Sequence, residues 1–355
     1  MRIRLSGTSG PAGWPAPNCR CASCNRAVEN RRQPLRITVD DAFTLRDPGV
    51  GTATPPPAGY SVTDTPYGTR VEGPDGGRLL YAATDAPADA AADGRGHGTH
   101  EVDVAIVDVV ASPQTIGALR RAGIVGVTTA VLAVGGDHRV PSPAEFERRA
   151  RLWAASAPSD GQDLHCPPAS WPGARIRGPH RVLITGGARS GKSAEAELRL
   201  LGEPEVTYLA TGPAAEGDDD WAGRVDLHRR RRPSWWKTEE SLDAATVLER
   251  ATGAVLFDCV GTWLAGMMER CGMWRETPPT GAESALEERI DELVDAWRRC
   301  SARIVAVTNE VGSGVVPATV SGGLFRDRLG RLNQRLAAES EQVALVTVGR
   351  VLELP

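Results

Sequence analysis

Short apolar runs alternate with amphipathic segments throughout the second half of the chain. Runs rich in β-branched residues predict buried strands at 182–184, 206–209, 254–257, 303–307 and 343–348. Helix-forming stretches separate several of them, at 193–201, 286–301 and 328–338. In the first of these stretches, Ala194, Leu198 and Leu201 are spaced for one helix face. Strands that alternate with helices predict an α/β fold with a mostly parallel sheet.

The first half has a looser pattern. Arg2 to Leu5 alternates between polar and apolar residues, as a half-buried strand does, and further apolar runs predict strands at 37–39, 79–81 and 104–107. Helices are predicted at 116–123 and 143–154. A chain of 355 residues exceeds a typical single core. We therefore expect a domain at 1–166, a Pro- and Gly-containing linker at 167–180 and a second domain at 181–355.

Composition limits the classes of partner. The formal net charge is −4, so no broad basic field exists and nucleic acid is not an expected partner. No apolar run is long enough for a membrane span, and the N-terminus lacks a signal-peptide hydrophobic region, so we expect a cytoplasmic protein. The seven cysteines, an odd number, then indicate thiols or metal ligands rather than disulfides.

A glycine-rich loop follows the strand predicted at 182–184. It fits the phosphate-binding pattern G-x-x-x-x-G-K-[ST] with Gly186, Gly187, Ala188, Arg189, Ser190, Gly191, Lys192 and Ser193. Glycines let the backbone turn its N–H groups toward an anion, and the start of the next helix adds partial positive charge. Lys192 can reach the β- and γ-phosphates, and the Ser193 hydroxyl can ligate Mg²⁺. The alternative is a chance glycine turn, but the chain has only two lysines, which makes the match selective.

The N-terminal half resembles the metallo-β-lactamase-fold phosphodiesterases. The resemblance rests on the segment Thr8 to Gly10 and on Cys19, Cys21 and Cys24, which form C-x-C-x-x-C. It implies that the three thiols hold a structural zinc ion, with His165 or Cys166 as a candidate fourth ligand. Three unpaired cysteines in a loop are the alternative.

The same resemblance implies that the hydrolase site of that fold is lost here. The positions that align with its metal-binding H-x-H-x-D-H motif hold Val110, Ser112, Gln114 and Thr115. None of them offers an imidazole or a carboxylate, so a dinuclear hydrolytic centre cannot be built from them. The nearby histidines are more typical of surface residues, at positions His97, His100 and His138. We therefore expect a degenerate metallo-β-lactamase-like domain.

The C-terminal half resembles the bifunctional adenosylcobinamide kinase/adenosylcobinamide-phosphate guanylyltransferases of cobalamin assembly. The match extends from Arg181 to Leu354 and includes the phosphate loop, Tyr208 to Thr211, the segment 224–240, Leu256 to Cys259, and 308–317 with 325–335. It implies phosphorylation of adenosylcobinamide with ATP or GTP, and then transfer of GMP from GTP onto the resulting phosphate. The second reaction of that family passes through a histidine–GMP adduct.

His228 is the expected carrier of GMP. It is the only histidine after the phosphate loop, and a neutral imidazole is nucleophilic near pH 7. The arginines that follow could neutralise a triphosphate, at Arg229, Arg230, Arg231 and Arg232. A solvated basic turn is the alternative. Some relatives have two adjacent histidines where this chain has Leu227 and His228, so guanylyl transfer depends on which position carries the nucleophile.

The resemblance implies further roles. Ala210, Thr211 and Gly212 line the nucleotide pocket, and Glu240 holds a nucleotide hydroxyl or the guanine edge. Asp258, at the end of a buried strand, suits a carboxylate linked to Mg²⁺, with a helix cap as the alternative. Relatives are trimers, which implies a homo-oligomer.

Three other functions compete with the bifunctional transferase. A P-loop small-molecule kinase or nucleotide-binding protein would lack the guanylyl transfer. A regulatory GTPase would carry an N-K-x-D segment, in which neither Lys192 nor Lys237 lies. A scaffold protein would leave the nucleotide site passive, against which Lys192, Ser193 and His228 argue.

Overall fold

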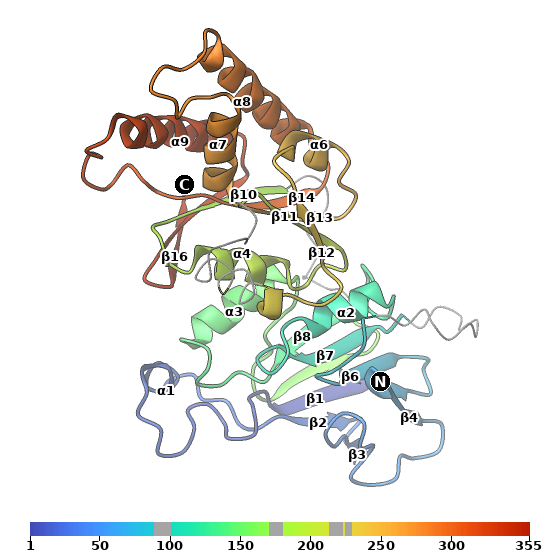
Figure 1. The fold of residues 1–355 in the computed structure, drawn as a ribbon. Coiled ribbons are helices and arrows are strands. Elements are labelled where there is room, and N and C mark those ends of the chain that lie inside the picture. Colours follow the sequence, from blue (N-terminus) through green and yellow to red (C-terminus); the bar gives the residue numbers. More distant parts are fainter. Residues whose placement is uncertain (89–100, 170–179, 213–222, 224–228) are drawn as a thin grey trace. The chain divides into compact units, whose positions relative to one another are not determined.

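The chain forms two compact units (Figure 1), seen in a computed structural model that describes residues 1–88, 101–169, 180–212, 223 and 229–355. The first unit comprises Met1–Ile176 with Leu201–Pro204, and the second comprises Arg177–Leu200 with Glu205–Pro355. The linker expected at 167–180 lies mostly outside the described residues. Among the described residues, no helix has both the length and the apolar character needed to cross a membrane.

Two sheets build the first unit. A four-stranded antiparallel sheet has the order β3-β2-β1-β9. Its strands are β1 (Arg2–Gly7), β2 (Arg36–Val39), β3 (Phe43–Thr44) and β9 (Gln162–His165). A five-stranded sheet has the order β4-β5-β6-β7-β8. Its strands are β4 (Ser61–Thr65), β5 (Gly68–Glu72), β6 (Arg78–Ala82), β7 (Val104–Asp108) and β8 (Ala130–Val134). The pairs from β4 to β6 are antiparallel and those from β6 to β8 are parallel.

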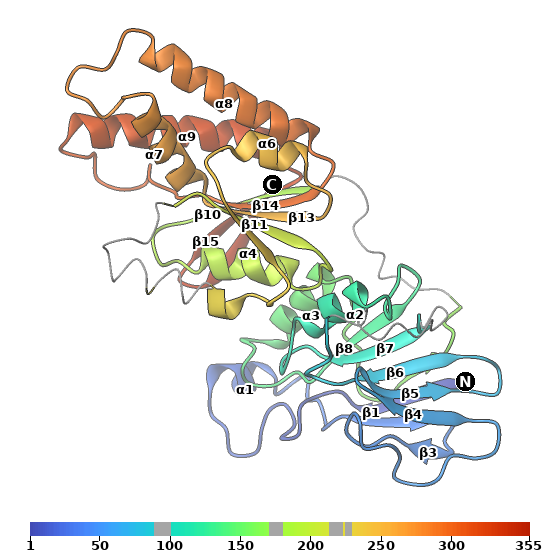
Figure 2. The same ribbon diagram turned by 45° about the vertical axis from the view of Figure 1, so that its right-hand side comes forward.

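One hydrophobic core joins the two sheets. Ile3 and Leu5 of β1 lie in the same buried cluster as Val104 and Ile106 of β7. The alternate residues of β7 are buried as well, because α2 (Thr115–Arg121) and α3 (Pro143–Leu152) lie along that side of β7 and β8 (Figures 1 and 2). A short helix, α1 (Ala22–Arg26), follows the first strand. The first unit is therefore layered, with the sheets at its centre.

A seven-stranded sheet forms the middle of the second unit, in the order β12-β11-β13-β14-β10-β15-β16. Its strands are β10 (His180–Thr185), β11 (Val206–Ala210), β12 (Lys237–Glu240), β13 (Ala254–Asp258), β14 (Arg303–Val307), β15 (Gln342–Thr347) and β16 (Arg350–Leu354). All neighbouring pairs are parallel except the β15–β16 hairpin. The sequence-based expectation of an α/β fold with a mostly parallel sheet is confirmed here.

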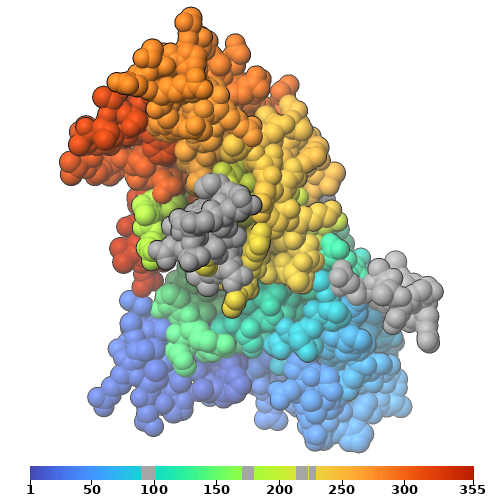
Figure 3. Space-filling model, in the orientation of Figure 1, coloured from blue at the N-terminus to red at the C-terminus, as the bar shows by residue number. Residues whose placement is uncertain are grey.

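Helices cover both faces of this sheet. The helix α4 (Lys192–Leu200) lies on one face, and the others lie on the opposite face (Figures 1 and 2). These are α6 (Ala244–Glu249), α7 (Val260–Arg270), α8 (Ala282–Arg299) and α9 (Val320–Ala338). The acidic and basic residues of α8 point outward, and this helix forms part of the orange surface in Figure 3. Its apolar residues face the core, as the amphipathic pattern predicted.

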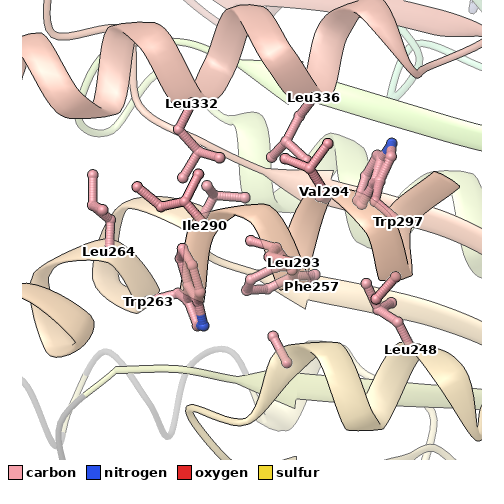
Figure 4. Packing of buried hydrophobic residues seen from close by; sticks show 14 of the residues in the cluster. Leu248, Phe257, Trp263, Leu264, Ile290, Leu293, Val294, Trp297, Leu332 and Leu336 are labelled. Atoms are coloured by element: carbon pink, nitrogen blue, oxygen red, sulfur yellow. The ribbon is translucent and has the colours of Figure 1, made fainter. Parts of the chain in front are cut away.

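The main core of the second unit lies between the sheet and this helical layer. Leu293 and Trp297 of α8 pack with Trp263 of α7, Phe257 of β13 and Leu332 of α9 (Figure 4). Each of these side chains is at most 2% exposed. Burial of one such side chain contributes about 1.5–3 kcal/mol before the entropy cost of ordering the chain. The core therefore holds in place the edge of the sheet at which β10, β13 and β14 end and their loops begin.

The burial of α4 differs from the prediction. Ala194 is exposed, whereas Glu195, Glu197 and Arg199 are buried. The predicted apolar face was wrong because this helix buries paired charges: Nε of Arg199 lies 2.8 Å from Oε1 of Glu195. A buried charge is tolerated when it is paired, which an apolar pattern cannot reveal.

Candidate functional site

The glycine-rich loop connects β10 to α4 and forms a tight turn. Gly186 needs to be a glycine, because a Cβ atom there would lie 2.4 Å from the Val346 carbonyl oxygen. Arg189 and Gly191 have φ values of 58° and 100°, in the left-handed range. Neighbouring loops brace the turn: the Gly349 N–H donates to the Ser190 carbonyl at 2.9 Å, and the Glu310 N–H donates to the Gly186 carbonyl at 3.2 Å.

Polar groups in this loop are left available for a ligand. The side-chain oxygens of Thr185 and Ser190 are buried and have no hydrogen-bond partner among the described residues. The Lys192 ammonium donates to the Gly187 carbonyl of the same loop, at 3.1 Å. Buried hydroxyls without partners are costly, and an anion that accepts from them would remove that cost. The loop thus fits a phosphate group.

Across the sheet, Asp258 ends β13 two strands away from the loop. It lies in register with Ala210 of β11 on one side and with Val307 of β14 on the other, and Val307 is in register with Ile184. Parallel strands bring these ends to one edge, which is where open α/β sheets bind ligands. The Tyr208 hydroxyl donates to Oδ2 of Asp258 at 3.0 Å. The carboxylate is therefore held in one orientation at the edge.

Thr211 ties the ends of β11 and β13 together. It is 3% exposed, and its hydroxyl donates to the Cys259 carbonyl at 2.7 Å and lies 2.9 Å from the Thr262 hydroxyl. The Cys259 N–H donates back to the Thr211 hydroxyl at 3.1 Å. The predicted nucleotide-binding residues Ala210 and Gly212 flank Thr211, whose side chain fixes the end of β11 against the start of α7.

Most of the arginine run contacts the protein itself. Arg229 pairs with Glu240 at 3.1 Å, and both side chains are more than half exposed. Arg231 pairs with Glu197 of α4, and Arg232 lies over the ring of Tyr208. The structure therefore brings together Arg229 and Glu240, which were both predicted to bind the nucleotide. Arg231 and Arg232 instead contact Glu197 and Tyr208. His228 lies outside the described residues.

Asn309 and Glu310 had no role in the sequence-based hypothesis, but the structure places them beside the phosphate loop. The Glu310 carboxylate accepts from the Gly312 N–H at 2.7 Å, which closes the turn after β14. The Asn333 side chain of α9 donates to the Asn309 carbonyl at 3.1 Å and accepts from the Thr308 hydroxyl at 2.6 Å. The signal that could have found them is their place directly after a buried strand.

A second cluster of chemically active side chains lies in the first unit. Ligand atoms of Cys19, Cys24 and His138 all lie within 4.8 Å of one another, the only such group among the residues that the structure describes. Cys21 is close by, since its Sγ accepts from the Cys24 N–H at 3.4 Å. Burial raises the pKa of the Cys24 thiol to about 11. Two thiols and an imidazole are donors that Zn²⁺ prefers.

The expected fourth ligand of that cluster was wrong. His165 pairs with Arg2 at the start of β1, while Cys19 follows the other end of that strand. Cys166 is buried beside Met1, whose carbonyl accepts from its N–H at 2.8 Å. His138 is exposed, as expected of a surface histidine, but its ring lies beside Cys19 and Cys24 because the loop after β8 reaches the cysteines. A sequence cannot show this contact, since 114 residues separate His138 from Cys24.

The residues that align with the metal-binding motif of a hydrolase follow the end of β7. The loop after β7 carries Val110, Ser112 and Gln114, Thr115 begins α2, and the carboxylate at the end of β7 belongs to Asp108. Asp108 accepts from the N–H groups of Val110 and Ala111 at 3.0 and 2.9 Å, so it orders this loop. His97 and His100 lie outside the described residues.

Comparisons with known proteins concern the second unit. The family model described as "Cobinamide kinase / cobinamide phosphate guanyltransferase" matches residues 182–354. The bifunctional adenosylcobalamin biosynthesis protein CobU of Salmonella typhimurium is 40% identical over 177 residues, which cover 47% of this chain and 96% of that protein. CobP of Pseudomonas aeruginosa, with the same description, is 38% identical over 180 residues, covering 49% of this chain and 96% of that protein.

A solved structure also matches weakly. The flagellar accessory protein FlaH from Methanocaldococcus jannaschii aligns with a TM-score of 0.27 and 11% identity, over 50% of this chain and 77% of that chain. A likeness of this degree carries no argument about function. The assignment of the chain to a family therefore depends on the sequence relatives and the phosphate loop.

Proposed function

Because the chain belongs to the cobinamide kinase / cobinamide phosphate guanyltransferase family, we propose that its second unit performs both reactions on adenosylcobinamide. It is a cobinamide kinase and guanylyltransferase of cobalamin biosynthesis. The single observation that carries this conclusion is the near-complete overlap with relatives of that description, 96% of whose length is matched, phosphate loop included. The residue roles that follow are proposals.

The phosphate loop serves the kinase reaction. Its backbone N–H groups and the hydroxyls of Ser190 and of Thr185 at the end of β10 donate hydrogen bonds to the phosphates of ATP or GTP, and Lys192 neutralises the β- and γ-phosphates. The hydroxyl oxygen of cobinamide then forms a bond to the γ-phosphorus as the bond to the β-phosphate oxygen breaks. The hydroxyl proton is released in the same step. Positioning and charge stabilisation supply the rate enhancement.

Ser193 and Asp258 are the proposed ligands of Mg²⁺. A hydroxyl at the start of α4 and a carboxylate at the same edge of the sheet are the hard oxygen donors that this ion takes. When bound, Mg²⁺ would neutralise the charge of the phosphates. The hydrogen bond from Tyr208 holds the Asp258 carboxylate ready for that role.

His228 is the proposed carrier of GMP. A ring nitrogen forms a bond to the α-phosphorus of GTP, and the bond to the β-phosphate breaks, so that pyrophosphate leaves with the electron pair. A phosphate oxygen of adenosylcobinamide phosphate then attacks the same phosphorus, the P–N bond breaks, and adenosylcobinamide-GDP forms. The imidazole needs no strong base, because its neutral form is already nucleophilic at pH 7.

A labelling experiment tests this assignment. The protein is incubated with α-labelled GTP, and we expect an acid-labile adduct that survives a denaturing gel. His228→Ala should abolish the adduct and spare phosphorylation of cobinamide. His165→Ala, on the exposed strand end of β9, is the matched control and should retain both activities. An adduct that persists in His228→Ala would reject the histidine, and kinase activity without any adduct in the wild type would favour the simple P-loop kinase.

For the first unit, we propose a degenerate metallo-β-lactamase-like domain with a structural zinc ion. Two sheets that share a core and the helices beside β7 and β8 support this fold. Cys19, Cys24 and His138 would hold the ion, with Cys21 adjacent as a further thiol. Such an ion would fasten the loop after β1 to the loop after β8.

Three further expectations stay predictions. The division into 1–166, 167–180 and 181–355 is testable by limited proteolysis, which should cut first in the linker. Assembly as a homo-oligomer, a trimer by resemblance, is testable by light scattering of the full chain. The cytoplasmic location is testable by fractionation of the cells that produce it.

A further inference from the structure

The residues that follow the proposed carrier histidine are attached to the phosphate-loop helix. Arg231 and Glu197 form a two-pronged ion pair, with Nε to Oε2 at 3.1 Å and the terminal nitrogen to Oε1 at 3.2 Å. Glu197 is 5% exposed and lies on α4, five residues after Lys192. The forked geometry suits a carboxylate well, and a buried carboxylate without a partner is costly. This contact therefore resists separation.

A second attachment reaches the strand beside the site. The guanidinium carbon of Arg232 lies 3.7 Å from the centre of the Tyr208 ring. Tyr208 is 7% exposed, and its hydroxyl is bonded to Asp258. A cation over an aromatic face is attracted by the ring's negative charge, more strongly when water is excluded. Two consecutive arginines thus bind two different elements, α4, which begins in the phosphate loop, and β11, which ends at the same edge of the sheet.

These contacts change the role of the basic run. The charge of Arg231 is balanced by Glu197, and the guanidinium of Arg232 is stacked on Tyr208. The pair of Arg229 with Glu240 differs, because 56% of the Arg229 side chain and 62% of the Glu240 side chain are exposed. An exposed ion pair is weak, so either side chain can give up its partner for a ligand. The run is therefore divided. Arg229 can contact a nucleotide, whereas Arg231 and Arg232 hold the chain against α4 and β11.

We propose that Arg231 and Arg232 are positioning residues for guanylyl transfer rather than ligands of the triphosphate. Their side chains anchor the chain that follows His228 in the sequence to α4 and to β11. The inference rests on the proposed guanylyl transfer, and it names the residues that fasten the chain just after the carrier histidine to α4 and β11.

Separate measurement of the two reactions tests the proposal on the full chain. Arg231→Ala and Glu197→Gln should lower the rate of adduct formation from α-labelled GTP by about 10- to 100-fold, since misplacement of a reacting group by an ångström has that effect. The dissociation constant of GTP and the kinase rate should change by less than about threefold. Arg231→Lys, which keeps the charge and loses the fork, should fall between. Arg299→Ala removes an exposed ion pair between α8 and Glu249 of α6 and serves as the matched control.

Exchange of the two charges of the Arg231–Glu197 pair tests the same contact even if the single variants unfold. Arg231→Glu combined with Glu197→Arg should recover at least about tenfold of the adduct rate lost in Arg231→Glu alone, because the pair is restored in the opposite sense. GTP binding that weakens in parallel with the adduct rate would overturn the proposal and make Arg231 a triphosphate ligand. Equal loss of both reactions in a folded variant would overturn it too. A wild-type protein without an adduct would instead reject the guanylyl transfer on which the inference rests.

Discussion

Tyr208 donates the hydrogen of its phenol to Oδ2 of Asp258 across 3.0 Å, from one parallel strand to the end of its neighbour. The ring is buried, and that burial together with the adjacent carboxylate keeps the phenol pKa far above its usual range. The hydroxyl therefore stays protonated and remains a donor at any pH at which the protein is folded. A fixed donor holds the carboxylate in one rotamer, as an outer partner of a metal ligand does.

Replacement of Tyr208 by Phe should loosen this carboxylate without opening a cavity. We expect the Mg²⁺ concentration for half-maximal kinase activity to rise about tenfold, the low end of the effect that such outer partners have. The fold should be retained, since the ring stays in place. A magnesium titration of the kinase rate measures this, and an unchanged requirement would show that Asp258 does not hold the ion.

Lys192 and Lys237 are the two lysines of the chain and form a natural pair of variants. Lys192→Met should lower the kinase rate by about 100-fold or more, because a charge directed at the transferred phosphate is lost. Lys237 lies exposed at the start of β12, and Lys237→Met should stay within about twofold of the wild type, as exposed surface charges contribute little. Similar losses of kinase rate in both variants would contradict a role of Lys192 at the transferred phosphate.

Metal analysis of the purified protein tests the cysteine–histidine cluster. We expect stoichiometric zinc that is lost in Cys24→Ser and in His138→Ala, and retained in Cys271→Ser of the second unit. Because burial raises the pKa of Cys24 to about 11, zinc must displace its proton at neutral pH. The apparent zinc affinity should therefore rise with pH, about tenfold per unit for each proton released. Retention of zinc in both variants would exclude these ligands.

The pair of Arg181 with Glu341 predicts a pH-dependent stability of the second unit. Hydrogen bonds from Arg181 hold the pKa of Glu341 at about 2. The group binds its proton more weakly in the folded state, so its contribution is present above the unfolded value of about 4.5 and is lost as pH falls toward 2. Since 37% of the Glu341 side chain is exposed, solvent screening leaves about 0.5–1 kcal/mol.

Urea unfolding of Glu341→Gln measures this contribution. The variant should be less stable than the wild type at pH 7, and the difference should shrink between pH 4.5 and 2. Glu283→Gln removes a carboxylate that is 66% exposed at the start of α8, and it serves as the control for the loss of a surface charge. A difference that stays constant down to pH 2 would contradict the assignment of the stabilising charge to Glu341.

Local pattern was enough for the strands that carry the site. The runs at 182–184, 254–257 and 303–307 are short, apolar and β-branched, and each coincides with a described strand. The phosphate loop follows from the same kind of local information, because glycine, lysine and serine at fixed spacing have few other uses. Local pattern failed for α4, where Glu195 and Arg199 are buried as a pair and Glu197 pairs with the distant Arg231.

Segments of weaker pattern were missed for a related reason. The strand β12 reads Lys-Thr-Glu-Glu and has no apolar signal, yet it pairs along β11 at the edge of the sheet. Edge strands need only one partner and little burial, so sequence imposes few limits on them. The helix α7 begins at Val260, with only Cys259 between it and Asp258, so the apolar residues of strand and helix follow each other closely and hide the boundary.

From the sequence alone followed the α/β class of the second unit, the phosphate loop with Lys192 and Ser193, and the resemblance that led to its family. These depend on residues close together in the chain, whose spacing determines their chemistry. Only the tertiary structure decided that His138 joins Cys19 and Cys24, and that Arg231 and Arg232 hold Glu197 and Tyr208. Each of these contacts joins residues 24 or more positions apart, and such pairs meet only when the sheets and helices are packed.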